Sequence, residues 1–298
     1  MAKGKRKSSG LLPANALAGL CLGVSVSESP DLARLGLSET HFRLALAEIA
    51  RCVLVSGGHL GYGGHLQPDG YTNFLIHELE RYSRRDHPLR IYLAWQEHRK
   101  LALSALAKER SNLGLYGEII CLDSPGNVVA ANKGRGEAPA PEVDADTVRR
   151  SLTGLRQHMA RATQGRVLIG GRRNGFQGDM PGVIEEALYG LEAGQPLYLA
   201  GGFGGVTHDI ACALGIDDGK WLPPLERPAP VDERLARGME RLVEAAKKTS
   251  FQSLENGLSA RENQRLAACY RPSEIATLVS HGLGRRFDKR AGPAPKPD

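Results

Sequence analysis

Three short apolar runs in this chain each lead into a cluster of glycines, and this repeated pattern constrains the fold more than any other feature. The three segments cover residues 53–64, 167–182 and 197–205. Glycine after a strand lets the backbone turn sharply and approach a ligand, because no Cβ stands in the way. Where a helix begins next, its unpaired N–H groups favour an anion. The pattern therefore predicts three turns along one edge of a parallel sheet, where phosphorylated ligands usually bind.

The segments around these clusters alternate between strand-like and helix-like patterns. Apolar, β-branched runs predict strands, and capped segments with apolar residues three or four positions apart predict helices. The predicted strands cover residues 20–27, 52–56, 90–94 and two runs between 166 and 200, and the predicted helices begin at Ser38 and Thr72 or cover residues 96–107 and 144–164. Residues 119–122 and 127–129 are weaker strand candidates for an added edge or a hairpin. This alternation predicts an α/β, Rossmann-like fold with a doubly wound, mostly parallel sheet and right-handed crossovers.

The character of the sequence changes after Pro223-Pro224. Helical patterns cover residues 232–248, 259–268 and 273–281, and no strand pattern accompanies them. A chain of 298 residues fits one large or two modest domains. We therefore expect a basic flexible N-terminus over residues 1–19, a Rossmann-like domain over 20–222, a helical C-terminal appendage over 223–288 and a disordered, proline-rich tail over 289–298.

The positive charge of the chain gathers near its ends. The net charge is +6, and the excess comes largely from Lys3, Lys5, Arg6, Lys7, Arg285, Arg286, Lys289, Arg290 and Lys296. Flexible basic ends are usually solvated arms. No alternation of basic and aromatic residues accompanies them, although surfaces that bind single-stranded nucleic acid usually combine the two. The charge pattern therefore argues against nucleic acid as the partner.

The cysteines and the hydropathy pattern favour a cytoplasmic protein. The five cysteines are odd in number and widely scattered, which suits buried thiols in a reducing compartment. No apolar run approaches the roughly 20 residues that cross a bilayer. Pro13, Asn15 and Gly19 interrupt the apolar run over residues 11–22, so we expect neither a signal peptide nor a membrane span.

Two histidines flank the first glycine cluster without completing a metal site. His59 and His65 stand six residues apart, and zinc would need a third ligand that the neighbouring sequence does not supply. The cysteines show no paired zinc spacing. We therefore expect no metal site and no required cofactor.

The second glycine cluster sits within a longer order of polar positions. Arg156 lies on a predicted helix, the strand 167–169 with Gly170 and Gly171 follows, and the segment 181–186 then opens the next helix. This order resembles the SLOG superfamily of Rossmann-like nucleotide-binding domains, named for its DNA-processing and LOG (lysine decarboxylase-like) proteins. In the LOG branch an arginine precedes the strand and a Pro-Gly-Gly-x-Gly-Thr-x-x-Glu turn follows it. The resemblance covers roughly residues 20–214 and implies that Arg156 and Glu186 are the catalytic pair, if the chain is an enzyme.

Two departures from the LOG pattern bear on activity. Residues 172–180 lengthen a turn that is compact in LOG enzymes, and Val183 replaces the threonine of the motif. The lengthened loop looks more like divergent SLOG members from bacterial conflict systems, which are associated with NAD-derived or other nucleotide signals. This resemblance implies a separately encoded effector protein as partner, and assembly into a homo-oligomer through helices beside the site.

The side chains themselves suit a nucleotide. Arg156 offers a rigid fork of donors for a phosphate or a pair of ribose hydroxyls. Glu186 could hold ribose hydroxyls or stabilise an oxocarbenium-like centre during N-glycosidic cleavage. Each also has a plainer interpretation, because acidic residues are favoured in the first turn of any helix and an arginine on an amphipathic helix is usually solvated.

The remaining candidate ligand contacts follow strand ends and glycine turns. Arg172 and Arg173 lie on the lengthened loop, where adjacent cations could close over phosphates. The predicted ligand-binding residues are Ser27, Glu28, Ser56, Gly57, Gly58, Gly61, Gly63, Gly64, Gly170, Gly171, Arg172, Arg173, Gly182, Glu185, Gly201, Gly202 and Gly204.

Three functions fit these features. The first is a sensor that binds a phosphorylated nucleoside or NAD derivative in a bacterial defence or signalling system. The second is a LOG-like hydrolase that cleaves the base from a nucleoside monophosphate or an NAD-like compound. The third is a DNA-binding protein of the DNA-processing branch, favoured only by the basic charge. The lengthened loop and the missing threonine favour binding over turnover, so the sensor is our expectation and the hydrolase is the alternative.

Overall fold

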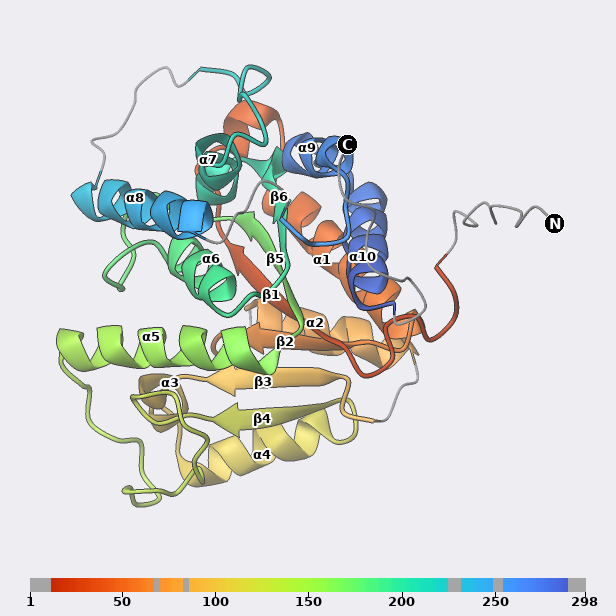
Figure 1. The fold of residues 1–298 in the computed structure, drawn as a ribbon. Coiled ribbons are helices and arrows are strands. Elements are labelled where there is room, and N and C mark those ends of the chain that lie inside the picture. The colour runs from red at the N-terminus through yellow and green to blue at the C-terminus, as the bar shows by residue number, and fades with distance from the viewer. Residues whose placement is uncertain (1–11, 67–69, 83–85, 225–231, 249–253, 289–298) are drawn as a thin grey trace.

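The sheet at the centre of the molecule has six strands in the order β4-β3-β2-β1-β5-β6, and every pair of neighbouring strands is parallel. The computed structural model describes residues 12–66, 70–82, 86–224, 232–248 and 254–288. The strands are β1 (Cys21–Ser27), β2 (His59–Gly63), β3 (Leu89–Leu93), β4 (Gly117–Cys121), β5 (Gly165–Gly170) and β6 (Leu197–Ala200). This order confirms the predicted α/β, Rossmann-like fold (Figure 1).

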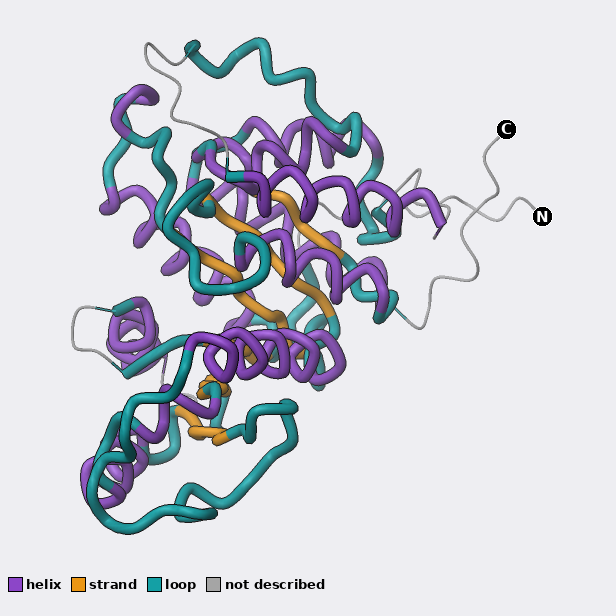
Figure 2. Tube along the Cα trace, turned by 90° about the vertical axis from the view of Figure 1, so that its left-hand side faces the viewer, coloured by secondary structure: helices purple, strands orange, loops and turns teal. Residues whose placement is uncertain are grey.

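Helices cover both faces of the sheet (Figure 2). The helices are α1 (Glu39–Val55), α2 (Tyr71–Leu79), α3 (Trp95–Arg99), α4 (Leu103–Leu113), α5 (Ala145–Ala162), α6 (Gly182–Glu192), α7 (Gly205–Ala213), α8 (Glu233–Lys248), α9 (Ala260–Ala268) and α10 (Pro272–Phe287). Side chains alternate across the strands, so Val167 and Ile169 of β5 join one apolar core with α1, α9 and α10. Leu168 joins a second core with α6, α7 and α8 on the opposite face.

The strand predicted over residues 52–56 is wrong, because α1 continues through it to Val55. Phe42, Leu46, Ile49 and Val53 recur at helical spacing and are all buried. The apolar run at the end of this helix is therefore the last part of a buried helical stripe, and a short apolar run alone does not distinguish the two structures. The strand begins instead at residue 59, so residues 56–58 precede β2 at the amino-terminal edge of the sheet.

The region predicted as one helix over residues 96–107 is divided into α3 and α4. The weaker strand candidate at residues 119–122 corresponds to β4, which extends the sheet as a parallel edge strand. Residues 127–129 form no strand, although Leu122 and Val128 form an isolated antiparallel bridge.

The C-terminal helices pack directly on the sheet and its helices. Leu242 of α8 lies in the core beside α6, and Leu266 of α9 and Leu283 of α10 lie in the core beside α1. In Figure 1 α10 runs alongside α1 and α8 alongside α6. Of the basic N-terminus predicted over residues 1–19, residues 1–11 lie outside the described residues, and so does the predicted disordered tail over residues 289–298; residues 12–19 are described, and Leu17 among them is fully buried. Within the described ranges, no helix has both the length and the apolar character needed to cross a membrane.

Candidate functional site

The order of the strands reverses between β1 and β5, and the carboxyl ends of these two strands meet. Ser27 and Gly170 are paired across the two strands, and the Gly171 amide donates to the Ser27 carbonyl at 3.0 Å. Gly170 has φ of 69°, a conformation that favours glycine. Ligands of open parallel sheets usually bind at such a reversal, so this edge is the candidate site.

Arg156 of α5 lies against the N-terminus of α6. Its Nη1 donates to Glu185 Oε2, and the Thr153 hydroxyl donates to the other oxygen of that carboxylate. A Cβ on Gly182 would lie 2.7 Å from Arg156 Nη2, and one on Gly178 would lie 3.0 Å from Nη1. The guanidinium therefore occupies a place that these two glycines keep open, beside the amides that begin α6.

Glu186 lies between two guanidinium groups. Its Oε2 accepts from the Ser25 hydroxyl and from Arg166 Nη1, the latter at 3.0 Å, and its Oε1 is 3.8 Å from Arg156 Nε. The structure thus brings the predicted pair, Arg156 and Glu186, together, on the sheet face beneath α5 and α6. We call Ser25, Thr153, Arg156, Arg166, Glu185 and Glu186 the Arg156 cluster.

Three members of this cluster were not predicted from the sequence, namely Ser25, Thr153 and Arg166, and Arg166 is the charged one. It is fully buried on β5, and its side chain also donates to Ser25 Oγ at 2.8 Å and Gln195 Oε1 at 3.1 Å, while its Nη2 is buried without a partner among the described residues. Burial lowers the pKa of Arg166, and the Glu186 carboxylate opposes that shift. The available signal was an arginine at the start of an otherwise apolar strand, where an unpaired charge would be too costly.

A second group of charged side chains lies at the N-terminus of α7. The buried Asp31 carboxylate accepts from the Gly205 amide at 2.6 Å and from both terminal nitrogens of Arg173 at 2.9 Å. Arg173 also donates to Asp209, at 2.7 and 2.8 Å, and Arg34 lies 2.7 Å from Asp31. Although burial raises the pKa of Asp31, hydrogen bonds from Arg173 and Gly205 hold it below its ordinary value. The chain's own carboxylate therefore takes the position that an anion would occupy at this helix.

The glycines at residues 201–204, which form the third glycine cluster of the sequence, are explained by packing. A Cβ on Gly201 would overlap the Ala267 carbonyl, one on Gly202 would overlap the backbone at Cys269, and one on Gly204 would lie 2.5 Å from Asp31. These glycines adjoin α9 and Asp31 rather than the β1–β5 edge.

The first glycine cluster is divided between the two edges of the sheet. Ser56, Gly57 and Gly58 lie at the amino-terminal edge, because the strand follows them. Gly61 lies within β2 and faces Thr163, since a Cβ there would come 2.9 Å from its Cγ2. Gly63 ends β2 against Met159, and Gly64 follows beside the ring of Tyr62. The structure therefore places Gly63 and Gly64, but not residues 56–58, at the carboxyl edge.

The last two predicted contacts form an exposed pair. Arg172 Nη2 lies 2.8 Å from Glu28 Oε2, and both side chains are more than half exposed. The pair joins the segment after β1 to the segment after β5, at the point where the strand order reverses. It remains accessible to a ligand.

A pocket of about 290 Å³ lies beside α3, the helix that follows the carboxyl end of β3. It is lined by Gln96, Glu97, Arg99, Lys100, Ala140, Pro141, Glu142, Val143, Val148 and Gln177. Gln177 belongs to the lengthened loop and adjoins Gly178, where an added Cβ would lie 3.0 Å from Arg156 Nη1. Gln96 is 5% exposed, and neither polar atom of its amide has a hydrogen-bond partner among the described residues. The sequence did not indicate this pocket, because its lining comes from α3, α5 and two loops.

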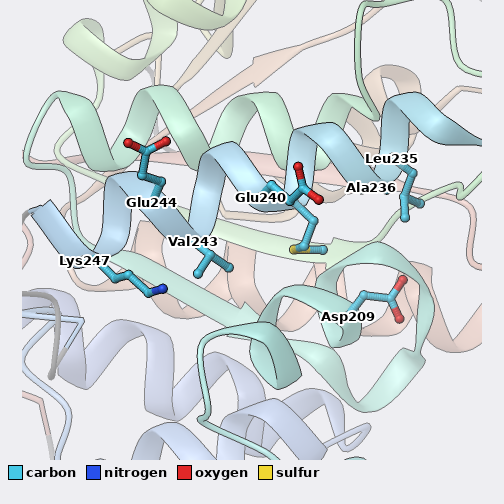
Figure 3. A pocket seen from close by; sticks show the side chains of 8 residues that line it. Asp209, Leu235, Ala236, Glu240, Val243, Glu244 and Lys247 are labelled. Atoms are coloured by element: carbon cyan, nitrogen blue, oxygen red, sulfur yellow. The ribbon is translucent and has the colours of Figure 1, made fainter.

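A larger groove of about 540 Å³ lies between α7 and α8 (Figure 3). Its lining is Asp209, Leu235, Ala236, Met239, Glu240, Val243, Glu244 and Lys247. The apolar side chains and three carboxylates suit an anionic phosphate poorly. We therefore place the candidate site at the Arg156 cluster and not in this groove.

Comparison with known proteins agrees with this fold. The family model described as SLOG cluster2 matches residues 16–266, most of the chain. No curated protein matches. The matched span includes β1 to β6 and the Arg156 cluster, and SLOG membership suggests nucleotide-related binding or processing. The chain therefore belongs to the SLOG family.

Proposed function

We propose that this protein binds a phosphorylated nucleoside derivative, either NAD-derived or a nucleoside phosphate, and acts as a sensor in a bacterial defence or signalling system. The observation that carries the proposal is the position of Arg156 at the N-terminus of α6. A guanidinium and free helical amides together form a strong phosphate-binding arrangement. A separately encoded effector would read the bound state.

The pocket beside α3 supports the nucleoside part of the proposal. Its volume of about 290 Å³ is near the lower end of the range for small-molecule sites. Gln177 lines this pocket, and the next residue, Gly178, lies so near Arg156 that an added Cβ would come 3.0 Å from its Nη1. A nucleoside in the pocket would therefore lie on the same loop that passes Arg156.

The Arg156–Glu185 ion pair gives a physical basis for sensing. A bound phosphate would compete with the Glu185 carboxylate for the Arg156 fork, so the free and bound proteins would hold Arg156 differently. A ligand shifts a conformational equilibrium only by its difference in affinity for the two states. Here that difference would come from exchanging one anion for another at the start of α6.

Cleavage of an N-glycosidic bond is the second candidate, favoured by the proximity of Arg156 and Glu186. In that reaction a carboxylate must stabilise positive charge on the ribose. Arg166 and Arg156 already compensate the charge of Glu186, and the Ser25 hydroxyl occupies one of its oxygens. This arrangement favours binding over turnover.

The experiment uses titration calorimetry with AMP, ADP-ribose and NAD, followed by chromatography for released base. We expect at least one of these to bind without product formation, and Arg156→Lys to weaken that binding by about 10-fold or more, since lysine keeps the charge but loses the fork. Arg150→Lys, on the exposed side of the same helix, is the matched control. Base release by the wild-type protein, lost in Glu186→Gln, would establish the hydrolase instead. Strong salt-dependent binding to single-stranded DNA, with no nucleotide bound, would favour the DNA-binding function.

A further inference from the structure

Three potential metal ligands meet at the C-terminal end of α7, on side chains that the nucleotide proposal does not use. His208 and Cys212 are one helical turn apart, and Asp217 follows in the next segment. The Ile216 amide donates to the Ala211 carbonyl at 2.9 Å, which folds the segment back along the helix. This return brings the Asp217 carboxylate to the other two groups, and all three ligand atoms lie within 4.8 Å of one another.

Two of the three distances between the ligand atoms match the edges of a zinc coordination tetrahedron. His208 Nε2 is 3.3 Å from Asp217 Oδ2 and 3.6 Å from Cys212 Sγ. With Zn–N near 2.0–2.1 Å, Zn–O near 2.0–2.2 Å and Zn–S near 2.3 Å, tetrahedral angles separate N from O by roughly 3.3 Å and N from S by roughly 3.6 Å. Both edges meet at the same imidazole nitrogen, and the third edge, between Cys212 Sγ and the Asp217 carboxylate, is no longer than 4.8 Å.

The surroundings would hold these ligands in place. The side chains of His208 and Asp217 are each only 6% exposed. Trp221 Nε1 donates to Asp217 Oδ2 at 2.5 Å, and the Trp221 ring meets the His208 ring edge-on at 5.0 Å. Gly219 approaches so closely that a Cβ would lie 3.2 Å from Cys212 Sγ. Outer hydrogen bonds of this kind orient ligands in metal sites.

We propose that His208 Nε2, Cys212 Sγ and Asp217 Oδ2 bind one Zn²⁺, with a water molecule in the fourth position. Thiolate and imidazole together select zinc among the common divalent ions. The neutral Cys212 thiol releases its proton to solvent when the ion binds, and the ion balances the two negative charges that result from Cys212 and Asp217. The site clamps the segment after α7 onto that helix.

The site was not predicted from the sequence, because the pattern His-x-x-x-Cys lacks the paired spacing of common zinc motifs and Asp217 reaches the other two ligands only through the fold.

The test uses the full chain, freed of any affinity tag, stripped with a chelator and titrated with Zn²⁺ or Co²⁺. We expect one ion per chain, and a sulfur-to-cobalt charge-transfer band with Co²⁺. Cys212→Ser should abolish that band, and Trp221→Phe should weaken zinc binding by about 10–100-fold, as loss of an outer hydrogen bond does. Cys52→Ser is the matched control, because Cys52 and Cys212 are the two half-buried cysteines of the described residues.

Alkylation of the unmodified chain gives a readout that no folding defect can imitate. Zn²⁺ should slow alkylation of Cys212 at least 10-fold relative to the metal-free chain, while Cys52 reacts at the same rate with and without the ion. Equal alkylation of Cys212 in both conditions, or a Co²⁺ spectrum without the sulfur band, would overturn the proposal. In that case the three side chains form only a buried hydrogen-bonded group.

Discussion

Arg166 and Glu186 show how a single buried charge can organise a site. Arg166 has no exposed surface, and Glu186 is the carboxylate that contacts it at 3.0 Å. Removing one partner of a buried ion pair leaves the other uncompensated, which costs far more than the pair itself contributes. Glu186 therefore supports the fold whether or not it also contacts a ligand.

We predict that Glu186→Gln lowers the free energy of unfolding by roughly 2–4 kcal/mol, because Arg166 loses its compensating charge. Denaturant unfolding followed by circular dichroism measures this value. Glu192→Gln, at the exposed end of α6, is the control and should change stability by less than about 0.5 kcal/mol. Equal stabilities for the two variants would show that Arg166 does not depend on Glu186.

His98 gives a second prediction at the scale of one residue. It is fully buried, and burial lowers its pKa to about 4, although its hydrogen bond with the Leu122 carbonyl opposes the shift. The unfolded chain binds this proton below about pH 6.5 and the folded chain only below about pH 4, so stability falls as the pH drops from 6.5 to 4.

Measuring the unfolding midpoint across that pH range tests the assignment. His98→Gln should show a shallower loss of stability between pH 6.5 and 4 than the wild-type chain, since one titrating group is gone. Parallel curves for the two proteins would mean that His98 does not titrate differently on folding.

At the scale of the element, the start of α6 determines whether a phosphate can reach Arg156. A Cβ on Gly182 would lie 2.7 Å from Arg156 Nη2, so alanine there must push the guanidinium away. We predict that Gly182→Ala weakens nucleotide binding by about 10-fold or more, equivalent to at least about 1.4 kcal/mol. Gly136→Ala, where an added Cβ meets nothing within 4 Å, should bind normally in the same calorimetric titration. Unaltered affinity in Gly182→Ala would place the ligand elsewhere.

The sequence predicted elements well where their patterns were long, and poorly where they were short. The helix over residues 144–164 was evident from its caps and appears as α5. Residues 52–56 were ambiguous, because four apolar residues followed by a serine fit the end of a helix as well as a strand. That error moved Ser56, Gly57 and Gly58 to the wrong edge of the sheet.

Parts of the site depend on contacts that no local pattern encodes. The pairing of Arg156 with Glu186 was implied by the resemblance to the SLOG superfamily. Asp31, by contrast, caps α7 through Gly205, which is 174 residues away in the chain. Only the folded arrangement shows that the Asp31 carboxylate already occupies the N-terminus of α7, where a phosphate could otherwise bind.

The whole molecule depends on its C-terminal helices. Ile275, Val279 and Leu283 of α10 are fully buried against the core that contains α1. We predict that deleting residues 272–298 abolishes cooperative thermal unfolding, because the deletion exposes the apolar face of α1. Deleting only residues 289–298 should leave the thermal transition within about 2 °C of the full chain. A truncated chain that still unfolds cooperatively would show that α10 is dispensable.

The most direct test of nucleotide recognition is a crystal structure with the ligand that binds most tightly among AMP, ADP-ribose and NAD. We predict a phosphate within hydrogen-bond distance of Arg156 and the first amides of α6, with the Arg156–Glu185 ion pair broken. A ligand bound in the groove between α7 and α8, with Arg156 still paired to Glu185, would contradict this prediction.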